Sequence, residues 1–411
     1  MKHLSLKSGL KVHSYMNEYL LYEDLFDIRV INPAYYEILK RCNGSKTKED
    51  IYYEIAKYYD FDICETSCRI AFEETIQKFL KSGIIIETEG ISFRQTEYGE
   101  RGFPYPILLA LELTDACNHK CPFCYLSANP TGNNINLKII DFIIENFANK
   151  THYIMISGGE PTLHPCFSKI VEKLSNFFKL SLITNGSCIN KISSSIWNYF
   201  SGIQISLYGF DEESYRFATG TSLKYKDLLN NIYQLSEIKP NLTVSIIITK
   251  QNIDSLEKYL ISLSSTNVKN ISFGIAIPLG RTFDGNSDSI IEPSDMQKAY
   301  FIVEKLREKY KDRFIISKFQ DASKYSKKNV LDKFSCMAGK TSVIIGANGN
   351  VRPCNIIPAK FFSQISIYDY AENIKRRKEY LIGNALKDFD CFLKENGYCV
   401  GDVKCAGFCN I

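Results

Sequence analysis

The sequence predicts an α/β protein with a partial (β/α)6 barrel in its middle, a smaller α+β domain before it and a cysteine-rich domain after it. The middle of the chain alternates strand-like and helix-like segments, which is typical of βα units around a parallel sheet. The first part has short strands followed by three helices. Six cysteines follow residue 330. We therefore expect domains at residues 1–92, 104–312 and 313–411.

The six expected barrel strands are aliphatic runs of five to seven positions. They are Ile107–Leu113, Tyr153–Ser157, Leu180–Thr184, Ile203–Leu207, Thr243–Thr249 and Ile271–Ile277. The expected helices between them are Leu137–Asn149, Phe167–Phe177, Lys226–Ile238 and Ser255–Leu263. Several polar or cysteine-bearing motifs come just after these strands, at the end where a βα barrel places its chemistry.

Three cysteines with the spacing C-x3-C-x2-C follow the first expected strand, at Cys117, Cys121 and Cys124. Three thiolates can hold a four-iron cluster and leave one iron open for a small molecule. Structural zinc sites usually have four ligands, commonly in C-x2-C pairs, so zinc is the weaker interpretation of this trio.

The chain resembles the radical S-adenosylmethionine (radical SAM) enzymes in this trio and in further segments that follow in order. These are Ser157–Pro161, Thr184–Gly186, Gln204–Gly209 with Arg216 beyond it, and Pro278–Arg281. The resemblance implies a 4Fe-4S cluster whose open iron is chelated by the amino and carboxylate groups of S-adenosylmethionine. One electron from the cluster then cleaves this cofactor to methionine and a 5'-deoxyadenosyl radical.

One set of candidate cofactor contacts follows the second and third barrel strands. Gly158 and Gly159 let backbone approach a ligand closely, and Glu160 can accept hydrogen bonds from an ammonium group. The resemblance adds Asn185 of the Thr-Asn-Gly segment. Taken singly, the two glycines would equally suit a turn at the end of a strand.

A second set comes from the cysteine run and the fourth strand. Arg216 offers a planar fork suited to a carboxylate, Ser206 offers a hydroxyl group, and Phe123 can pack beside a flat purine. A surface ion pair for Arg216 and core packing for Phe123 are the plainer alternatives. The shared order of these motifs favours a cofactor site.

Residues 1–92 resemble the RiPP recognition element, a winged-helix-like domain that binds the leader of a ribosomally synthesised, post-translationally modified peptide (RiPP). Helices are expected at Ala34–Cys42, from Lys48 and from Thr66, with a break at Asn43-Gly44. Leader capture by strand addition needs an accessible sheet edge, for which we expect Leu25–Val30.

Winged helices also bind DNA, but the expected helices of this domain are mixed in charge. They carry Glu49, Asp50, Glu54 and Asp60. We therefore expect no nucleic-acid partner.

The six C-terminal cysteines resemble the SPASM or Twitch extension of radical SAM enzymes, which carries auxiliary iron–sulfur clusters. The resemblance implies one or two such clusters. One would use Cys336, Cys354 and Cys409 and keep an open iron, and a second would use Cys391, Cys399 and Cys405. One four-cysteine cluster and a zinc site are the alternatives, since two complete clusters need more ligands than are present. Asn348-Gly349, between the first two cysteines, predicts a hairpin turn.

Composition fits a globular protein, with 45% apolar residues, 23% charged residues and a formal net charge of +4. No run of about 18 apolar residues and no signal peptide is present, so we expect no membrane partner and a cytoplasmic location. Fourteen cysteines in such a chain favour metal ligation over disulfides. The isolated ones are expected to be buried thiols: Cys42, Cys64, Cys68, Cys166 and Cys188.

The sequence thus predicts a radical SAM maturase that binds a precursor peptide through its leader and takes electrons from a flavodoxin or ferredoxin. We favour a thioether link between a peptide cysteine and a carbon, because an open auxiliary iron could hold the thiolate near the radical-bearing carbon. Carbon–carbon or carbon–oxygen crosslinks and epimerisation at Cα are alternatives. A non-catalytic leader-binding or regulatory protein is an alternative from another class.

Overall fold

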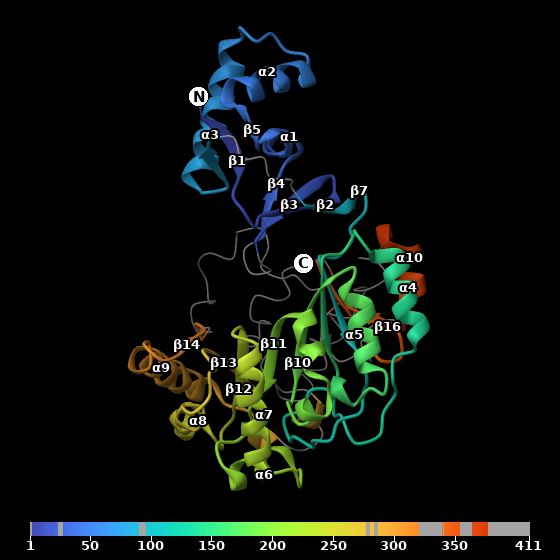
Figure 1. The fold of residues 1–411 in the computed structure, drawn as a ribbon, viewed down its shortest axis with the longest axis vertical. Helices are drawn as coiled ribbons and strands as arrows, with labels where there is room; N and C mark the ends of the chain where they lie inside the picture. The colour runs from blue at the N-terminus through green and yellow to red at the C-terminus, as the bar shows by residue number, and fades with distance from the viewer. Residues whose placement is uncertain are drawn as a thin grey trace. The chain divides into compact units, whose positions relative to one another are not determined.

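The computed structural model describes residues 2–23, 28–89, 96–276, 280–282, 287–319, 339, 341–353 and 364–376. The chain divides into two compact units (Figure 1). The first unit comprises Met1–Ile107 and Asn149–Thr151, and the second comprises Leu108–Ala148 and His152–Ile411. Among the described helices, none is long and apolar enough to cross a membrane.

The second unit is built on a sheet of ten strands in the order β14-β13-β12-β11-β10-β9-β8-β15-β16-β17. The strands are β8 (Leu108–Glu112), β9 (Tyr153–Ser157), β10 (Lys179–Thr184), β11 (Phe200–Ser206), β12 (Leu242–Ile248), β13 (Asn270–Ile275), β14 (Ile315–Ile316), β15 (Ser342–Ile345), β16 (Asn350–Arg352) and β17 (Ile365–Ser366). Strands β8 to β14 pair in parallel, and β15 joins β8 in parallel on the other side. This arrangement confirms the expected α/β fold, with β8 to β13 as the six expected strands.

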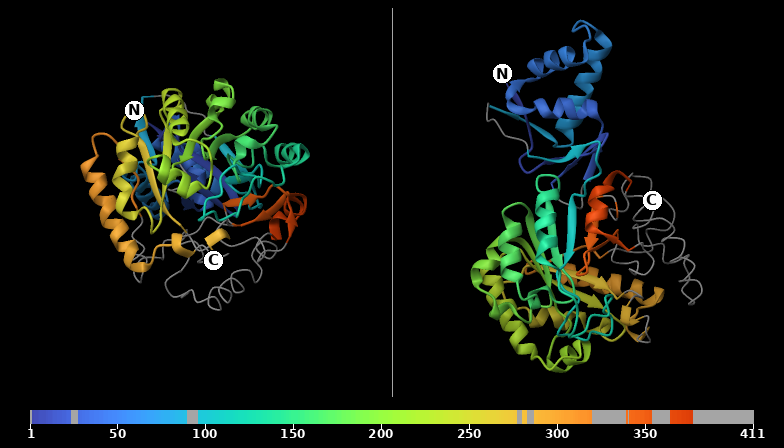
Figure 2. Two further views of the ribbon diagram at one scale, coloured as in Figure 1. Left: turned by 90° about the horizontal axis from the view of Figure 1, so that it is seen from below. Right: turned by 90° about the vertical axis from the view of Figure 1, so that its right-hand side faces the viewer.

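Helices cover one face of this sheet. They are α4 (Leu137–Phe147), α5 (Phe167–Ser175), α6 (Glu212–Thr219), α7 (Tyr225–Ile238), α8 (Leu256–Ser262), α9 (Pro293–Lys309) and α10 (Ile367–Glu372). Figure 2 shows α4, α5, α7, α8 and α9 along the outer side of the curved sheet. Strand residues such as Leu109, Ile156 and Ile205 are fully buried beneath them. In β10 and β11 the buried residues alternate with half-buried ones such as Ser181 and Gln204, because successive side chains of a strand point to opposite faces of the sheet.

The hairpin signal at Asn348-Gly349 is confirmed, because β15 and β16 pair in antiparallel fashion around it. Gly349 has a φ of +80°, which glycine adopts without steric cost. The pairing of β15 with β8 adds this hairpin to the barrel sheet. Cys354 comes two residues after the end of β16 in the sequence, but all six C-terminal cysteines lie outside the described residues.

The first unit contains two small sheets and three helices. The strands are β1 (His3–Leu6), β2 (Lys11–Met16), β3 (Glu18–Tyr22), β4 (Ile28–Ile31), β5 (Asn43–Thr47), β6 (Ile85–Thr88) and β7 (Glu97–Arg101), in the orders β5-β1-β6 and β4-β3-β2-β7. The helices are α1 (Pro33–Arg41), α2 (Lys48–Tyr59) and α3 (Thr66–Lys81). Strand β7 pairs with β2, so this unit continues beyond residue 92.

Two details of this unit bear on the sequence expectations. The expected break at Asn43-Gly44 is strand β5, which pairs with β1. The described part of the expected docking edge, Ile28–Val30, belongs to β4, which lies at one edge of the four-stranded sheet.

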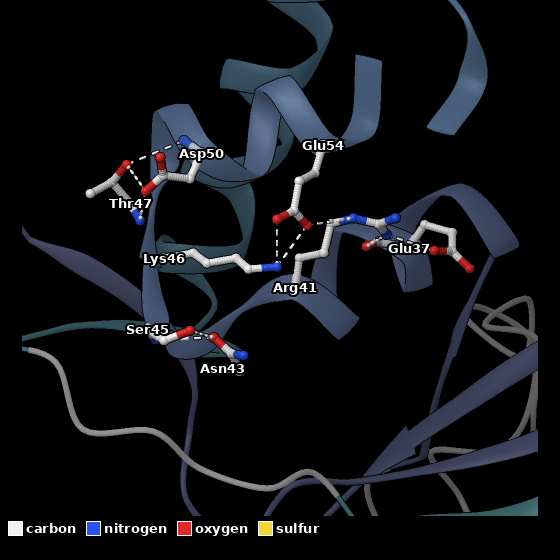
Figure 3. A network of polar contacts seen from close by, with 8 residues as sticks. All are labelled: Glu37, Arg41, Asn43, Ser45, Lys46, Thr47, Asp50 and Glu54. Atoms are coloured by element: carbon white, nitrogen blue, oxygen red, sulfur yellow. Dashed lines mark hydrogen bonds and ion pairs between the residues drawn. The ribbon is translucent and has the colours of Figure 1, made fainter. Parts of the chain in front are cut away.

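Helices α1 and α2 begin with side-chain caps and are joined by a polar network. Asn32 accepts a hydrogen bond from the Tyr35 N–H at 2.8 Å, and Thr47 forms a capping box with Asp50. Figure 3 shows the network beside them, in which Glu54 pairs with both Arg41 and Lys46, and Arg41 also pairs with Glu37.

The isolated cysteines are only partly as expected. Cys42 and Cys188 are buried, Cys68 and Cys166 are half-buried, and Cys64 is exposed. The expectation that Cys64 is buried was wrong. Cys64 is exposed because it lies in the connection between α2 and α3 and not on an apolar helix face.

Candidate functional site

The three cysteines lie in the loop between β8 and α4, at the carboxyl end of the first barrel strand. Cys117 and Cys121 are buried, Cys124 is half-buried, and all three are free. Burial raises the pKa of Cys117 to about 11, and the neighbouring Cys124 adds to this effect. Burial also raises the pKa of Cys121, reinforced by both other thiols. Burial therefore disfavours the ionised thiolates in the absence of a metal. Iron ligation would favour them, because metal-bound thiols lose their protons.

The described residues contain no group of three His, Cys, Asp or Glu side chains that could hold a single metal ion. A trio of thiolates is the ligand set of a four-iron cluster with one open iron, whereas structural zinc sites usually have four protein ligands.

The end of β9 clamps the start of the cysteine loop. The Gly159 N–H donates to the Thr114 carbonyl at 2.7 Å, and the Glu160 N–H donates to the Ala116 carbonyl at 2.8 Å. A Cβ on Gly159 would lie 2.3 Å from the Ala116 oxygen, and one on Gly158 would lie 2.5 Å from the Thr114 oxygen. Glycine is thus required at both positions because the backbone of the cysteine loop, at Thr114 and Ala116, lies against them.

A second clamp holds the other half of the loop. The Arg281 backbone N–H donates to the Cys124 carbonyl at 3.1 Å, and its guanidinium donates to the Cys121 carbonyl at 2.8 Å. Gly280 has a φ of +58° and leaves no room for a Cβ beside the Cys124 oxygen. Gly280 and Arg281 are the described part of the Pro278–Arg281 segment. Pro278 and Leu279 lie outside the described residues.

The carboxylate of Glu160 is buried and ties the end of β9 to the end of β10. Its Oε1 accepts from the Thr184 hydroxyl at 2.7 Å and from both the N–H and the hydroxyl of Thr162. Its Oε2 accepts from the Asn185 N–H at 2.6 Å. Burial raises the pKa of Glu160, and these hydrogen bonds oppose the rise. Oε1 thus accepts three hydrogen bonds, whereas Oε2 accepts one.

An amide network connects Asn185 to the first cysteine. The Asn185 side chain donates to Asn118 Oδ1 at 2.8 Å and lies 3.8 Å from Cys117 Sγ. Asn118 in turn donates to the Ser187 hydroxyl at 2.8 Å. Sequence reasoning missed Asn118 and Ser187, although Asn118 lies within the cysteine run and Ser187 directly follows Thr-Asn-Gly.

Aromatic rings form another side of the site. The rings of Phe123 and Tyr208 meet edge to face with centroids 5.0 Å apart. Ser206 hydrogen-bonds the Tyr208 hydroxyl, and burial raises the pKa of Tyr208, with a further rise from Cys121, Cys124 and Cys117. Tyr208 lies within the Gln204–Gly209 segment, yet sequence reasoning gave it no role.

Helix α6 presents two different faces. On its inner side the Tyr215 hydroxyl contacts His119 Nε2 at 3.0 Å, and burial lowers the pKa of this histidine to about 4, so it is neutral. Arg216 is exposed on the outer side, where it lines a surface hollow with Glu212, Glu213 and Phe217.

The structure therefore brings together most of the predicted site residues. Gathered around the loop are Cys117, Cys121, Cys124, Phe123, Gly158, Gly159, Glu160, Asn185 and Ser206. Arg216 stands apart on the exposed face of α6.

Comparison with known proteins matches residues 111–262 to the radical SAM superfamily. The chain is 24% identical over 364 residues to the antilisterial bacteriocin subtilosin biosynthesis protein AlbA of Bacillus subtilis, covering 85% of this chain and 77% of AlbA. It is also 24% identical over 256 residues to the sporulation killing factor maturation protein SkfB of Bacillus subtilis, covering 61% of this chain and 60% of SkfB.

Among solved structures, the fold is similar to that of Streptococcus suis SuiB. With SuiB bound to S-adenosylmethionine the TM-score is 0.64 at 13% identity, covering 94% of this chain and 90% of SuiB. With SuiB bound to its precursor peptide SuiA the TM-score is 0.62 at 14% identity, covering 93% and 89%. At this identity the likeness establishes the fold.

Proposed function

Residues 111–262 of this chain form a radical SAM domain, and from that premise we propose that the protein is a maturase that modifies a ribosomally made precursor peptide. A radical SAM domain uses a 4Fe-4S cluster and S-adenosylmethionine. The observation that carries the proposal is the clamped loop of Cys117, Cys121 and Cys124. AlbA and SkfB, whose names describe peptide biosynthesis and maturation, support the peptide as the substrate class.

When bound, the cluster and S-adenosylmethionine supply a 5'-deoxyadenosyl radical that can remove a hydrogen atom from carbon. The three cysteines would hold the cluster, and the clamps from Gly159 and Arg281 fix the loop that carries them. Glu160 Oε2, which accepts one hydrogen bond within the protein, is the proposed acceptor for the cofactor ammonium group. Phe123 and Tyr208 provide flat surfaces for its adenine.

The first unit supplies a place for the leader of the precursor. Its strand β4 lies at a sheet edge, where an extended peptide can add as a further strand. Main-chain hydrogen bonds would then give affinity, and side chains that flank β4 would give specificity.

Within this function we favour a thioether between a peptide cysteine and a carbon. AlbA and SkfB support this choice as relatives that act in peptide maturation. The six C-terminal cysteines, proposed here to hold one or two auxiliary clusters, would provide an iron for the substrate thiolate. In forming this bond, the carbon would lose a hydrogen atom to the 5'-deoxyadenosyl radical and the thiol would lose its proton, and the one electron left over would return to an iron–sulfur cluster.

Incubation of the reduced protein with S-adenosylmethionine and the cysteine-containing precursor tests both levels of this proposal. We expect 5'-deoxyadenosine, and a peptide that has lost two hydrogens and no longer reacts with a thiol-alkylating reagent. A peptide that loses two hydrogens and still alkylates fully indicates a crosslink without sulfur. An unchanged mass with an inverted Cα indicates epimerisation.

The same reaction with a precursor that lacks its leader tests the role of the first unit. We expect the leaderless precursor to be modified much more slowly than the full precursor. Cleavage of S-adenosylmethionine without any peptide should be unchanged, because it needs no leader. Equal modification rates with and without the leader would contradict leader recognition.

A further inference from the structure

Asn185 follows β10 directly, and its side chain belongs to a closed ring of three polar residues. Asn185 Nδ2 donates to Asn118 Oδ1 at 2.8 Å, and Asn118 Nδ2 donates to the Ser187 hydroxyl at 2.8 Å. The Ser187 backbone N–H completes the ring by donating to Asn185 Oδ1 at 2.9 Å. The ring therefore connects the cysteine run to the turn that follows β10.

The Ser187 backbone N–H fixes the orientation of both side-chain amides in this ring. A backbone N–H can only donate, so the atom of Asn185 that accepts from it must be the oxygen. Asn185 Nδ2 then faces Asn118, which must present its own oxygen and direct its nitrogen to the Ser187 hydroxyl. Neither amide can flip without placing two donors or two acceptors face to face, so the Asn185 N–H groups have a defined direction.

The second N–H of Asn185 Nδ2 is available to the sulfur of Cys117. A side-chain amide nitrogen carries two hydrogens, and Asn118 accepts one of them. Nδ2 lies 3.8 Å from Cys117 Sγ, which also accepts from the His119 backbone N–H at 3.4 Å. Asn185 and Cys117 are 6% and 9% exposed, so water screens the contact between them only weakly. Both N–H groups of Asn185 are thus used within the protein.

The backbone around Asn185 is held as firmly as its side chain. The Asn185 N–H donates to Glu160 Oε2 at 2.6 Å, and the Gly186 N–H donates to Thr184 Oγ1 at 3.0 Å. Asn231, on α7, donates from Nδ2 to the Gly186 carbonyl at 2.9 Å. The amide of Asn185 is therefore already in position beside the first cysteine of the loop.

We propose that the Asn185 amide donates a hydrogen bond to the Cys117 thiolate of the assembled 4Fe-4S cluster, and that Asn118 is the positioning residue that holds the amide there. This role rests on the proposed function, in which the three cysteines hold the cluster. Reduction adds one electron to the cluster, and no bond forms or breaks. An N–H donor to a ligand sulfur stabilises the more negative state, so it raises the reduction potential. Asn118 therefore makes the cluster easier to reduce.

The test is a redox titration of the full-length protein with its clusters assembled, followed by electron paramagnetic resonance without S-adenosylmethionine. One variant is Asn118→Ala, which removes the acceptor that orients Asn185. The other is Asn185→Leu, which removes the N–H donor at similar side-chain size. The matched control is Asn146→Ala, because Asn146 is half-buried like Asn118 but lies on α4, where its amide donates to a backbone carbonyl of the same helix.

Two further measurements accompany the titration. The resonance signal that is missing from the variant with all three loop cysteines changed to Ala is assigned to the cluster of the loop. Iron content and the dissociation constant of S-adenosylmethionine are measured for each protein.

We expect Asn185→Leu to lower the ratio of reduced to oxidised loop cluster about tenfold at a fixed potential, which is the effect of about one hydrogen bond. For a one-electron couple, this change corresponds to a fall of about 59 mV in the reduction potential. Asn118→Ala should lower the ratio about threefold, because Asn185 keeps its N–H groups but loses the acceptor that orients them. Asn146→Ala should leave the ratio unchanged, and iron content should be equal in all proteins.

An unchanged ratio in both Asn185→Leu and Asn118→Ala would overturn this role. Weaker binding of S-adenosylmethionine at an unchanged ratio would also overturn it, because the amide would then serve the cofactor and not the cluster. Loss of iron from Asn118→Ala would assign the ring to assembly of the loop and overturn the role as well. If the variant without the loop cysteines loses no signal, the proposed function itself is contradicted, because the loop then holds no cluster.

Discussion

Glu54 in the first unit and two carboxylates of the second unit, Glu112 and Glu160, differ sharply in burial. In the first unit, Glu54 is 43% exposed and shares Arg41 and Lys46 in a network at the surface. In the second unit, Glu112 and Glu160 are 2% and 0% exposed. Glu160 is satisfied by hydroxyl and backbone donors, and Glu112 by Arg352.

The difference indicates which charges organise the site. Exposed ion pairs contribute about 0 to 1 kcal/mol, whereas removing one partner of a buried pair costs about 3 to 5 kcal/mol. Glu112 ends β8, just before the cysteine loop, and Glu160 lies between β9 and β10. Both buried carboxylates therefore fix strand ends that carry the loop, while the exposed network stabilises only its local surface.

Glu160→Ala should have the largest effect among single substitutions at these charges, because we expect it to lower stability and also to abolish activity. It removes the acceptor of Thr184 and of the Asn185 N–H and leaves these donors buried. We expect the free energy of unfolding to fall by about 3 kcal/mol in urea titrations, and 5'-deoxyadenosine formation to be lost. The exposed Glu172→Ala on α5 is the control. A change below about 0.5 kcal/mol for Glu160→Ala would place this carboxylate in the same class as the surface charges.

Arg352→Met should have a large effect that depends on pH. Burial raises the pKa of Glu112, and Arg352 opposes this rise. Without the guanidinium, the pKa of Glu112 in the folded protein rises further above its value in the unfolded chain. The free energy of unfolding is therefore lowered most at high pH, where the carboxylate is ionised. This loss of stability shrinks as the pH falls and the buried carboxylate becomes protonated. We expect a loss of about 3 kcal/mol at pH 7, measured by urea unfolding.

The matched control for this pair is the double variant Glu112→Gln/Arg352→Met, which removes the buried charge altogether. It should recover most of the stability and show little dependence on pH. A loss in Arg352→Met that stays constant from pH 7 to pH 5 would show that the guanidinium acts through packing alone.

Glu54→Gln should have the smallest effect. Its partners Arg41 and Lys46 remain partly solvated, and Arg41 keeps its pairing with Glu37. We expect a loss below about 0.5 kcal/mol that disappears at high salt. A salt-insensitive loss above about 1 kcal/mol would remove the contrast between the two units.

Sequence reasoning succeeded where the signal is local. The apolar runs located β8 to β13, and the spacing of Cys117, Cys121 and Cys124 located the loop. The Asn348-Gly349 signal located a hairpin. These features depend on neighbouring residues and on strand period, which a single sequence displays directly.

Contacts between distant segments could not be predicted in the same way. Glu112 and Arg352 are 240 positions apart, and no periodicity links them. The contact of Phe123 with Tyr208 depends on the packing of the loop against β11. Arg216 was matched by motif order, but motif order does not specify which face of α6 carries its side chain. Orientation on a short helix is set by packing, here by Tyr215 against His119.

The most direct test of the central claim is the triple variant Cys117→Ala/Cys121→Ala/Cys124→Ala, incubated with S-adenosylmethionine and dithionite without oxygen. Its control is Cys64→Ala/Cys166→Ala, which changes two cysteines outside the loop. We predict that the control forms 5'-deoxyadenosine at the rate of the unchanged protein, and that the triple variant forms none. Cleavage by the triple variant at the unchanged rate would contradict the assignment of radical chemistry to this loop.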